Sequence, residues 1–176
     1  MNLLKISKDL IESVMSEVEE NADYVQELVD NLVQKCCGNL DKYLEYVNKI
    51  LGNSDYALTN DELDDIIITI PSILYYVGDQ QEKLGIKRDV SESTRSLLYN
   101  KIYLETTGTA GARKAAADQQ LFNESLVSIV YNGAYEAIKA KTSIALEVLQ
   151  SAKKIMTRRI AEVDLSKSAP NRMLVE

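Results

Sequence analysis

The sequence predicts an all-α fold, a helical bundle or hairpin organised around one long C-terminal helix. Residues 109–163 contain no proline, and their apolar side chains recur mostly three or four residues apart, which is the spacing of a helix. At ~1.5 Å per residue this helix would reach roughly 80 Å, more than one compact domain of this size covers. We therefore expect part of its apolar stripe to be buried against a second copy of the chain.

The middle of this stripe is the predicted self-contact. Small residues there would let a second backbone approach closely, and apolar residues continue the same face. The predicted oligomer interface consists of Gly133, Ala137, Ile144 and Val148. The alternative is that the chain's own helices fill this groove.

Two helices are expected in the first 52 residues. Residues 1–20 carry apolar side chains at helical spacing and end in an acidic run, and residues 24–51 repeat the spacing with Gly38 as a candidate kink. A Gly-Asn-Ser sequence at 52–54 should stop the second helix. These residues form the acidic N-terminal helical region of the predicted division into 1–52, 53–163 and 164–176.

The next helix should begin at a capping box formed by Thr59 and Glu62. Pro71 should kink or restart it, and Gly85 should end it. A further helix should run from Asp89 or Ser91 to Gly108. The acidic residues of the first turn are interpreted as helix capping rather than as a metal site, because no second cluster of ligands accompanies them. The tail, 164–176, loses the periodicity.

Composition argues against an enzyme. The 176 residues, 45% hydrophobic and 27% charged, describe one ordinary soluble domain without histidine. The absence of histidine removes the commonest general base, the commonest metal ligand and the usual partner of a nucleophilic Ser or Cys. The turn at 108–114 contains glycines and a lysine but lacks the Walker spacing and the preceding strand. We expect no catalytic residues, no cofactor and no metal.

Two observations predict a cytoplasmic protein. Cys36 and Cys37 are adjacent in a helical stretch, where a disulfide between them would be badly strained, so a reducing compartment fits. The N-terminus lacks a signal-peptide pattern, and the longest apolar run, 66–77, is too short to span a bilayer. We expect no membrane partner.

Charge is distributed unevenly along the chain. Residues 1–70 hold 5 basic and 15 acidic side chains, a balance of -10, whereas residues 71–176 hold 15 and 12, a balance of +3. Basic stripes attract phosphate backbones, which makes Lys139 and Lys141 on the long helix candidate phosphate contacts. The helix dipole offers an alternative explanation for the cations nearest the C-terminus, Arg158 and Arg159.

A second basic group surrounds the glycine turn. Arg95, Tyr99 and Tyr103 stand four residues apart on one helix face, where an arginine and two aromatic rings can hold an unpaired base beside a phosphate. The alternative is that these tyrosines are core or interface residues. Arg113 and Lys114 open the following helix, whose free N–H groups favour anions. The alternative there is a linker with solvated cations.

Three stretches resemble phage recombination mediators of the UvsY type. They are YNKIYLETTG at 99–108, the Arg113-Lys114 helix start, and GAYEAIKAK at 133–141 followed by Ala145 and Leu149; the resemblance covers roughly residues 72–160. It implies a small all-helical phage protein that assembles into rings, binds single-stranded DNA and loads a recombinase onto strands occupied by a single-strand-binding protein. The family ties DNA binding to a Lys-x-Arg pair before the glycine turn. Lys101 matches the lysine, and Tyr103 stands in the arginine position.

The sequence and the resemblance together predict a non-enzymatic, homo-oligomeric recombination mediator in the host cytoplasm. Its partners would be single-stranded DNA, a phage recombinase and a single-strand-binding protein. Residues 1–52 lack a counterpart in the resemblance and would be an added partner-binding module. Two alternatives stay open: a phage virion or assembly component, and a small inhibitor or adaptor whose acidic half docks on a basic partner.

Overall fold

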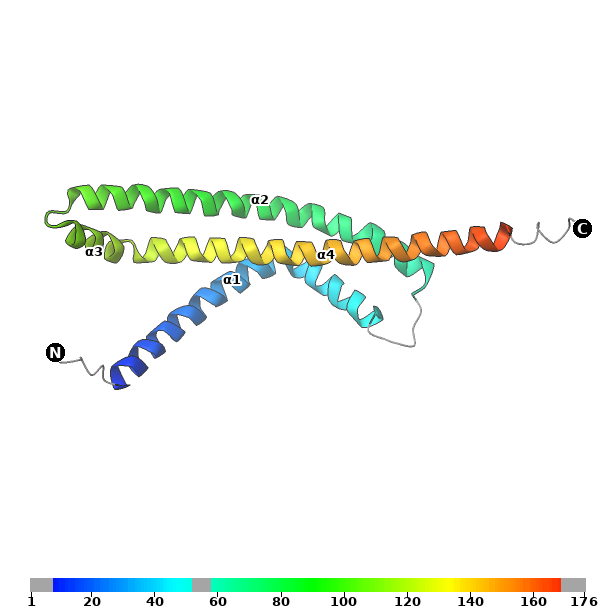
Figure 1. Ribbon diagram of the computed structural model, residues 1–176, viewed down its shortest axis with the longest axis horizontal. Coiled ribbons are helices and arrows are strands. Elements are labelled where there is room, and N and C mark those ends of the chain that lie inside the picture. The colour runs from blue at the N-terminus through cyan, green and yellow to red at the C-terminus, as the bar shows by residue number, and fades with distance from the viewer. Residues whose placement is uncertain (1–7, 52–57, 169–176) are drawn as a thin grey trace, which may run out of the picture. The chain divides into compact units, whose positions relative to one another are not determined.

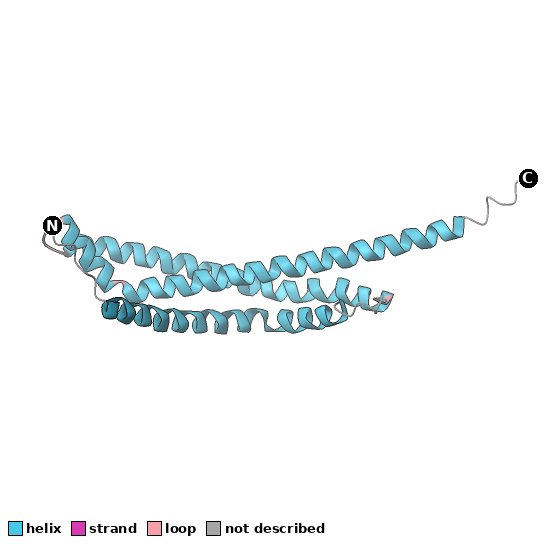
Figure 2. Cartoon of the chain, turned by 60° about the horizontal axis from the view of Figure 1, so that its bottom comes forward, coloured by secondary structure: helices cyan, strands magenta, loops and turns pink. Residues whose placement is uncertain are grey.

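The computed structural model of the chain describes residues 8–51 and 58–168. These residues form α1 (Lys8–Leu51), α2 (Asn60–Glu105), α3 (Ala110–Gln120) and α4 (Phe122–Ser168), without a strand among them (Figure 1; Figure 2). The prediction of an all-α fold is confirmed. The predicted helix start at 1–7, the stop at 52–54 and the tail at 169–176 lie outside the described residues.

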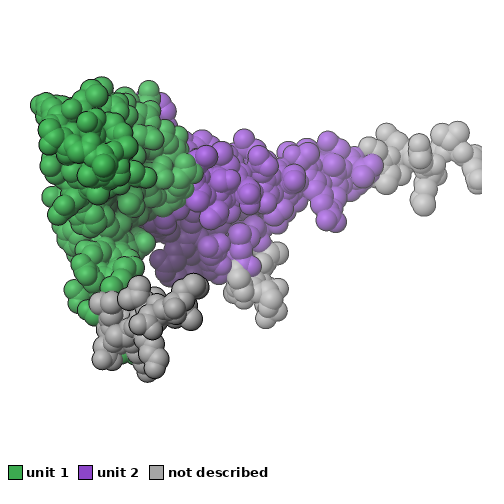
Figure 3. Space-filling model, turned by 60° about the vertical axis from the view of Figure 1, so that its left-hand side comes forward, with its two compact units in different colours: residues 1–35, 81–137 green, residues 36–80, 138–176 purple. Residues whose placement is uncertain are grey.

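Two compact units divide the chain (Figure 3). Unit 1 contains Met1–Lys35 and Gln81–Ala137, and unit 2 contains Cys36–Gln80 and Ile138–Glu176. The boundaries fall inside α1, α2 and α4, so each of these helices contributes one segment to each unit. The predicted division at residues 52 and 163 follows the chain, whereas the units combine segments that are distant in sequence.

Each unit has its own apolar core. In unit 1 the buried side chains are Val29, Val33, Leu84, Ala117, Leu121, Val130 and Ala134. In unit 2 they are Cys37, Leu40, Val47, Leu63, Ile66, Ile70, Val77, Ile138, Ala145, Leu149 and Ala152. Most of these positions recur every three, four or seven residues along their helices, so the periodicity that predicts the helices also marks the faces that they bury.

The first two predicted helices are one. The expected interruption between residues 20 and 24 is absent, because α1 runs unbroken from Lys8 to Leu51. Neither glycine nor proline stands in that interval. The Asn21 side-chain amide donates to the Glu17 carbonyl at 2.9 Å, so this polar side chain bonds to the preceding helical turn instead of ending the helix.

The predicted end at Gly85 is also wrong, and the helix does not restart at Pro71. α2 continues through Pro71 and Gly85 to Glu105. At the proline, the hydroxyl of Ser72 donates to the Ile68 carbonyl at 2.9 Å, and the ring itself lies on an exposed face. At Gly85, a Cβ would lie 3.3 Å from Cε2 of Tyr135. The glycine therefore serves close packing against α4 rather than helix termination.

The long C-terminal helix is broken once and extends further than predicted. Leu121 separates α3 from α4 with φ −102° and ψ 18°, and its side chain is buried. Backbone hydrogen bonds continue on both sides of the break, from Leu121 N–H to Ala117 and from Ser125 N–H to Leu121. At the other end α4 includes residues 164–168, which were expected in the irregular tail.

Candidate nucleic-acid interface

A sharp turn brings the end of α2 beside the start of α3 in unit 1. Gly108 has φ +123°, a conformation that favours glycine over every residue with a Cβ. Thr109 then caps α3, and its side chain accepts a hydrogen bond from the Ala112 N–H at 3.3 Å. The Arg113 side chain donates from Nε to the Gly108 carbonyl at 3.1 Å, which holds the turn closed.

Tyr99 and Tyr103 stack on each other at the end of α2. Their ring centroids are 6.2 Å apart, and the ring planes differ by 15°. The guanidinium of Arg113 lies 6.0 Å from the Tyr103 ring centroid, within reach of a cation–π contact. The structure therefore brings together three of the predicted binding residues from two helices.

A hollow of about 520 Å³ opens beside this stack. We call the residues that line this hollow, together with Arg113, the tip site. The lining residues are Tyr99, Asn100, Tyr103, Ala110, Gly111 and Lys114. The first N–H groups of α3 belong to Ala110 and Gly111, and Lys114 is exposed. Unpaired N–H groups, the positive end of the helix dipole and two cations create an environment that attracts an anion such as phosphate.

The remaining predicted cations do not all join the tip site. Arg95 is exposed and one helical turn before Tyr99, on the same face of α2. Lys101 is exposed, but at two residues from each tyrosine it stands about 200° away around the helix. Lys139 and Lys141 belong to unit 2. Lys141 donates to a carboxylate oxygen of Asp41 at 2.6 Å.

The predicted oligomer interface has mixed surroundings. A Cβ at Gly133 would lie 3.2 Å from Cγ2 of Val29, so α1 of the same chain occupies the groove at that position. Ala137 is half-buried. Ile144 and Val148 line the same hollow of about 260 Å³ within unit 2; Ile144 is 55% exposed, whereas Val148 is half-buried. Ile144 is therefore the member of this set that is available to another molecule.

The acidic start of α2 is a helix cap. The Thr59 N–H donates to Oε2 of Glu62 at 2.8 Å, and the Glu62 N–H donates to Oγ1 of Thr59 at 3.2 Å, as in a capping box. Asp65 accepts the hydroxyl of Tyr43 at 2.7 Å. Among the described residues, Asp, Glu and Cys do not form a group of three that could hold a metal ion.

Two groups in unit 2 resist ionisation. Burial, with a further contribution from Asp41, raises the pKa of the Cys37 thiol from 9.0 to about 11. Burial, followed by the hydrogen bond to Asp65, raises the pKa of Tyr43 above its ordinary value. A protonated, fully buried thiol is a poor nucleophile, so Cys37 serves packing rather than chemistry.

The sequence pattern gives no sign of Asn100 as a site residue or of the packing role of Gly85. Asn100 lines the tip site but stands between the two tyrosines in sequence, where helical spacing gives no signal of it. Gly85 accommodates Tyr135, whose ring also lies 4.3 Å from the Arg88 guanidinium. The packing of α3 beside α2 reveals the place of Asn100, and the packing of α4 beside α2 reveals the role of Gly85.

Comparison with protein-family models, curated proteins and solved structures finds no match to this chain. Within 8–51 and 58–168, the helices lack an apolar stretch long enough to cross a membrane.

Proposed function

We propose that this protein is a non-enzymatic, self-assembling mediator that binds single-stranded DNA at the tip site. The observation that carries the proposal is the parallel tyrosine stack beside a hollow flanked by Arg113 and Lys114. Single-strand binders combine aromatic rings, on which bases stack, with cations that contact the phosphate backbone. The tip site supplies both within one unit.

The tip site favours an unpaired strand over a duplex. Both tyrosines are half-buried, and both line the hollow. A base can extend the stack only when it has left its own helix, because a paired base has both faces covered. The contacts available are stacking and phosphate attraction, so base sequence should matter little.

A single tip site can contact only a short piece of a strand, and assembly would increase the number of sites that one strand contacts. A ring or stack of protomers would present several copies along one strand, so that individually weak contacts sum through a high effective concentration. The exposed Arg95 would extend the phosphate path along α2. Lys101, Lys139 and Ile144 are exposed at other points of the surface.

The mediator role extends this proposal through the resemblance to the UvsY type. A protomer array holding a single strand could present it to a phage recombinase and displace a single-strand-binding protein. The setting would then be the host cytoplasm. Binding by the tip site is the first requirement of this role.

A virion or assembly component is the second candidate function. Tyr75 and Tyr76 on α2 form an edge-to-face pair with centroids 5.6 Å apart, and they are 78% and 71% exposed. Adjacent exposed aromatic side chains are typical of surfaces that bind other proteins. A structural protein would use such surfaces without holding DNA.

Fluorescence anisotropy with a labelled oligothymidine and a labelled duplex tests the proposal. The single strand should bind more tightly, and Tyr103→Ala should lose roughly 1–3 kcal/mol of binding whereas Tyr103→Phe should keep most of it. Lys114→Ala should also reduce the salt slope by about 0.7, the value for one phosphate on a single strand. Lys87→Ala, an exposed lysine elsewhere on α2, is the matched control.

Absence of binding at low salt by a folded protein would refute the proposal. The virion or assembly function would then be the better explanation, because a protein that cannot hold a strand cannot present one to a recombinase.

A further inference from the structure

A stretch near the N-terminus of α1 and a stretch near the C-terminus of α4 carry exposed apolar side chains. Residues 12–24 of α1 are called the acidic end below, and residues 153–167 of α4 are called the basic end. We propose that the acidic end of one copy of the chain docks on the basic end of another, head to tail. This proposal rests on the self-assembly proposed above and is independent of DNA binding.

The acidic end continues the core face of α1. Val14 and Val18 are one helical turn apart, and they share the face of Val25 and Val29, seven and eleven residues after Val18. Val29 is buried and Val25 half-buried, whereas Val14 and Val18 are 51% and 60% exposed. The stripe that packs within unit 1 therefore runs on into a stretch whose side chains are exposed throughout.

The basic end repeats this pattern on α4. Leu149 and Ala152 are buried in unit 2, and the same face continues through the half-buried Met156 to Ile160 and Val163. Ile160 is 56% exposed and Val163 is 49% exposed. Each end thus presents a narrow apolar stripe of the kind that pairs with another helix.

Charge selects the pairing between these stripes. The acidic end holds five acidic residues and no basic one: Glu12, Glu17, Glu19, Glu20 and Asp23. The basic end holds five basic residues against two acidic ones, Glu162 and Asp164, a balance of +3; the five are Lys153, Lys154, Arg158, Arg159 and Lys167. Two acidic ends would repel each other, so self-pairing is disfavoured and an acidic–basic pair is favoured.

The cations of the basic end remain at the surface. Arg158 has an 82% exposed side chain and pairs with Glu162 one turn later at 2.8 Å. Arg159 instead donates to Asn60 at 2.9 Å and to the Leu58 carbonyl, which ties it into unit 2. Lys153 and Lys154 are exposed. The arriving acidic end therefore meets the cations that flank the stripe.

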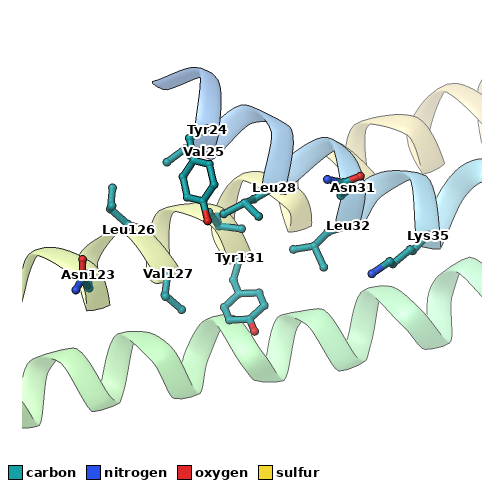
Figure 4. Close-up of a pocket in the computed structure, with 11 residues that line it drawn as sticks. Tyr24, Val25, Leu28, Asn31, Leu32, Lys35, Asn123, Leu126, Val127 and Tyr131 are labelled. Carbon is teal, nitrogen blue, oxygen red and sulfur yellow. The ribbon is translucent and has the colours of Figure 1, made fainter. Parts of the chain in front are cut away.

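The acidic end also adjoins an apolar groove in unit 1. Its last residue, Tyr24, lines a hollow of about 720 Å³ with Val25, Leu28 and Leu32 of α1 and with Leu126, Val127, Val130 and Tyr131 of α4. Figure 4 shows the labelled side chains of both helices around this hollow. The groove extends the apolar surface beyond Val14 and Val18 and could receive a large aliphatic side chain of the basic end.

Such a contact uses two different surfaces, so a docked pair still has one free acidic end and one free basic end. Heterologous contacts of this type close into rings or grow into filaments, depending on the rotation between copies. Assembly should therefore involve more than two chains.

Two substitutions and their mixture test the docking. Val18→Asp places a charge in the apolar stripe of the acidic end, and Ile160→Asp does the same in the basic end. Both positions are exposed, so the helical circular dichroism should be unchanged. In sedimentation at micromolar concentration, each variant alone should show the mass of one chain. The equimolar mixture should show two chain masses, because the intact basic end of the first variant holds the intact acidic end of the second.

The matched controls are Val90→Asp and Ile86→Asp. Both side chains are 58% exposed on α2, outside the two ends, and these variants should assemble as the parent does. A charge exchange gives a second measurement. Glu17→Lys with Glu20→Lys in one chain, and Lys153→Glu with Lys154→Glu in another, should each weaken assembly. Mixing the two should give two chain masses, because the unaltered basic end of the first variant pairs with the unaltered acidic end of the second.

Three outcomes overturn the proposal. If the parent assembles and neither aspartate variant changes its mass, the interface is elsewhere and self-assembly stands. If the mixture stays at one chain mass, the contact is not head to tail. If the parent itself is a single chain at micromolar concentration, self-assembly fails as well, and the anisotropy measurement on Tyr103→Ala still decides DNA binding.

Discussion

The ammonium of Lys141 lies 2.6 Å from Oδ1 of Asp41, and this ion pair joins α4 to α1 in unit 2. The two side chains are 35% and 32% exposed, so the pair is sheltered more than a surface salt bridge. Local charge alone makes Lys141 a candidate phosphate contact. Its carboxylate partner, a hundred residues away, gives it a structural role.

Replacing Lys141 should therefore change stability more than DNA binding. We expect Lys141→Met to lower the free energy of unfolding by about 1 kcal/mol, because Asp41 loses its partner. Oligonucleotide affinity should stay within a factor of two. Lys114→Ala should show the opposite pattern. Urea titrations and anisotropy on both variants make the comparison, and a large loss of affinity in Lys141→Met would place this lysine on the DNA path.

Two helical glycines should respond differently to alanine. A Cβ at Gly78 meets nothing within 4 Å, so Gly78→Ala should stabilise the protein by about 0.5–1 kcal/mol through helix propensity. At Gly133 the new Cβ lies 3.2 Å from Val29, and this contact should cancel or reverse the gain. Urea titration measures both. An equal gain at both sites would mean that α1 does not fill the groove, leaving it open to a second copy.

The capping box at the start of α2 should be cooperative. Thr59→Ala and Glu62→Ala should each cost about 1 kcal/mol, because each leaves a backbone N–H at the start of α2 without its acceptor. Asp64→Ala, a neighbouring exposed carboxylate in the same helix, should cost less. A double-mutant cycle on Thr59 and Glu62 should show an interaction energy, and strict additivity would contradict the reciprocal hydrogen bonds.

Stability should fall in alkaline solution because of Cys37. Below pH 9 both the folded and the unfolded thiol keep the proton. Between pH 9 and about 11 the unfolded thiol ionises while the folded one does not, so stability is lost as pH rises. At ~1.4 kcal/mol per pKa unit the loss is at most a few kcal/mol. Urea titrations at pH 8 and 10.5 should show a smaller change in Cys37→Ala than in the parent; equal changes would contradict a buried, protonated thiol.

Local pattern predicted helices well and their limits poorly. The capping box at Thr59 and the turn at Gly108 are short-range features, and both occur where the sequence places them. α2 neither restarts at Pro71 nor ends at Gly85, because neighbouring hydrogen bonds and the Tyr135 ring accommodate those residues within the helix. The break at Leu121 has no glycine or proline to mark it, so local composition could not predict it.

The candidate site was predictable to the extent that its members share one helix face. Tyr99 and Tyr103 stand four residues apart, and that spacing alone places their rings side by side. Arg113 and Lys114 lie beside these rings because the chain turns at Gly108. The direction of that turn could not be predicted from the sequence. The position of Asn100 in the hollow follows from the same turn.

The sequence by itself determined the all-α class, because a helix is closed by hydrogen bonds between residues four apart and its apolar period is legible over any short window. Only the tertiary structure decided which stripe meets which. Val29 fills the groove at Gly133, and Asp41 engages Lys141, through contacts that span about a hundred residues. Such pairings depend on the fit between surfaces that are distant in sequence, and a local sequence pattern does not indicate which surface a helix face will contact.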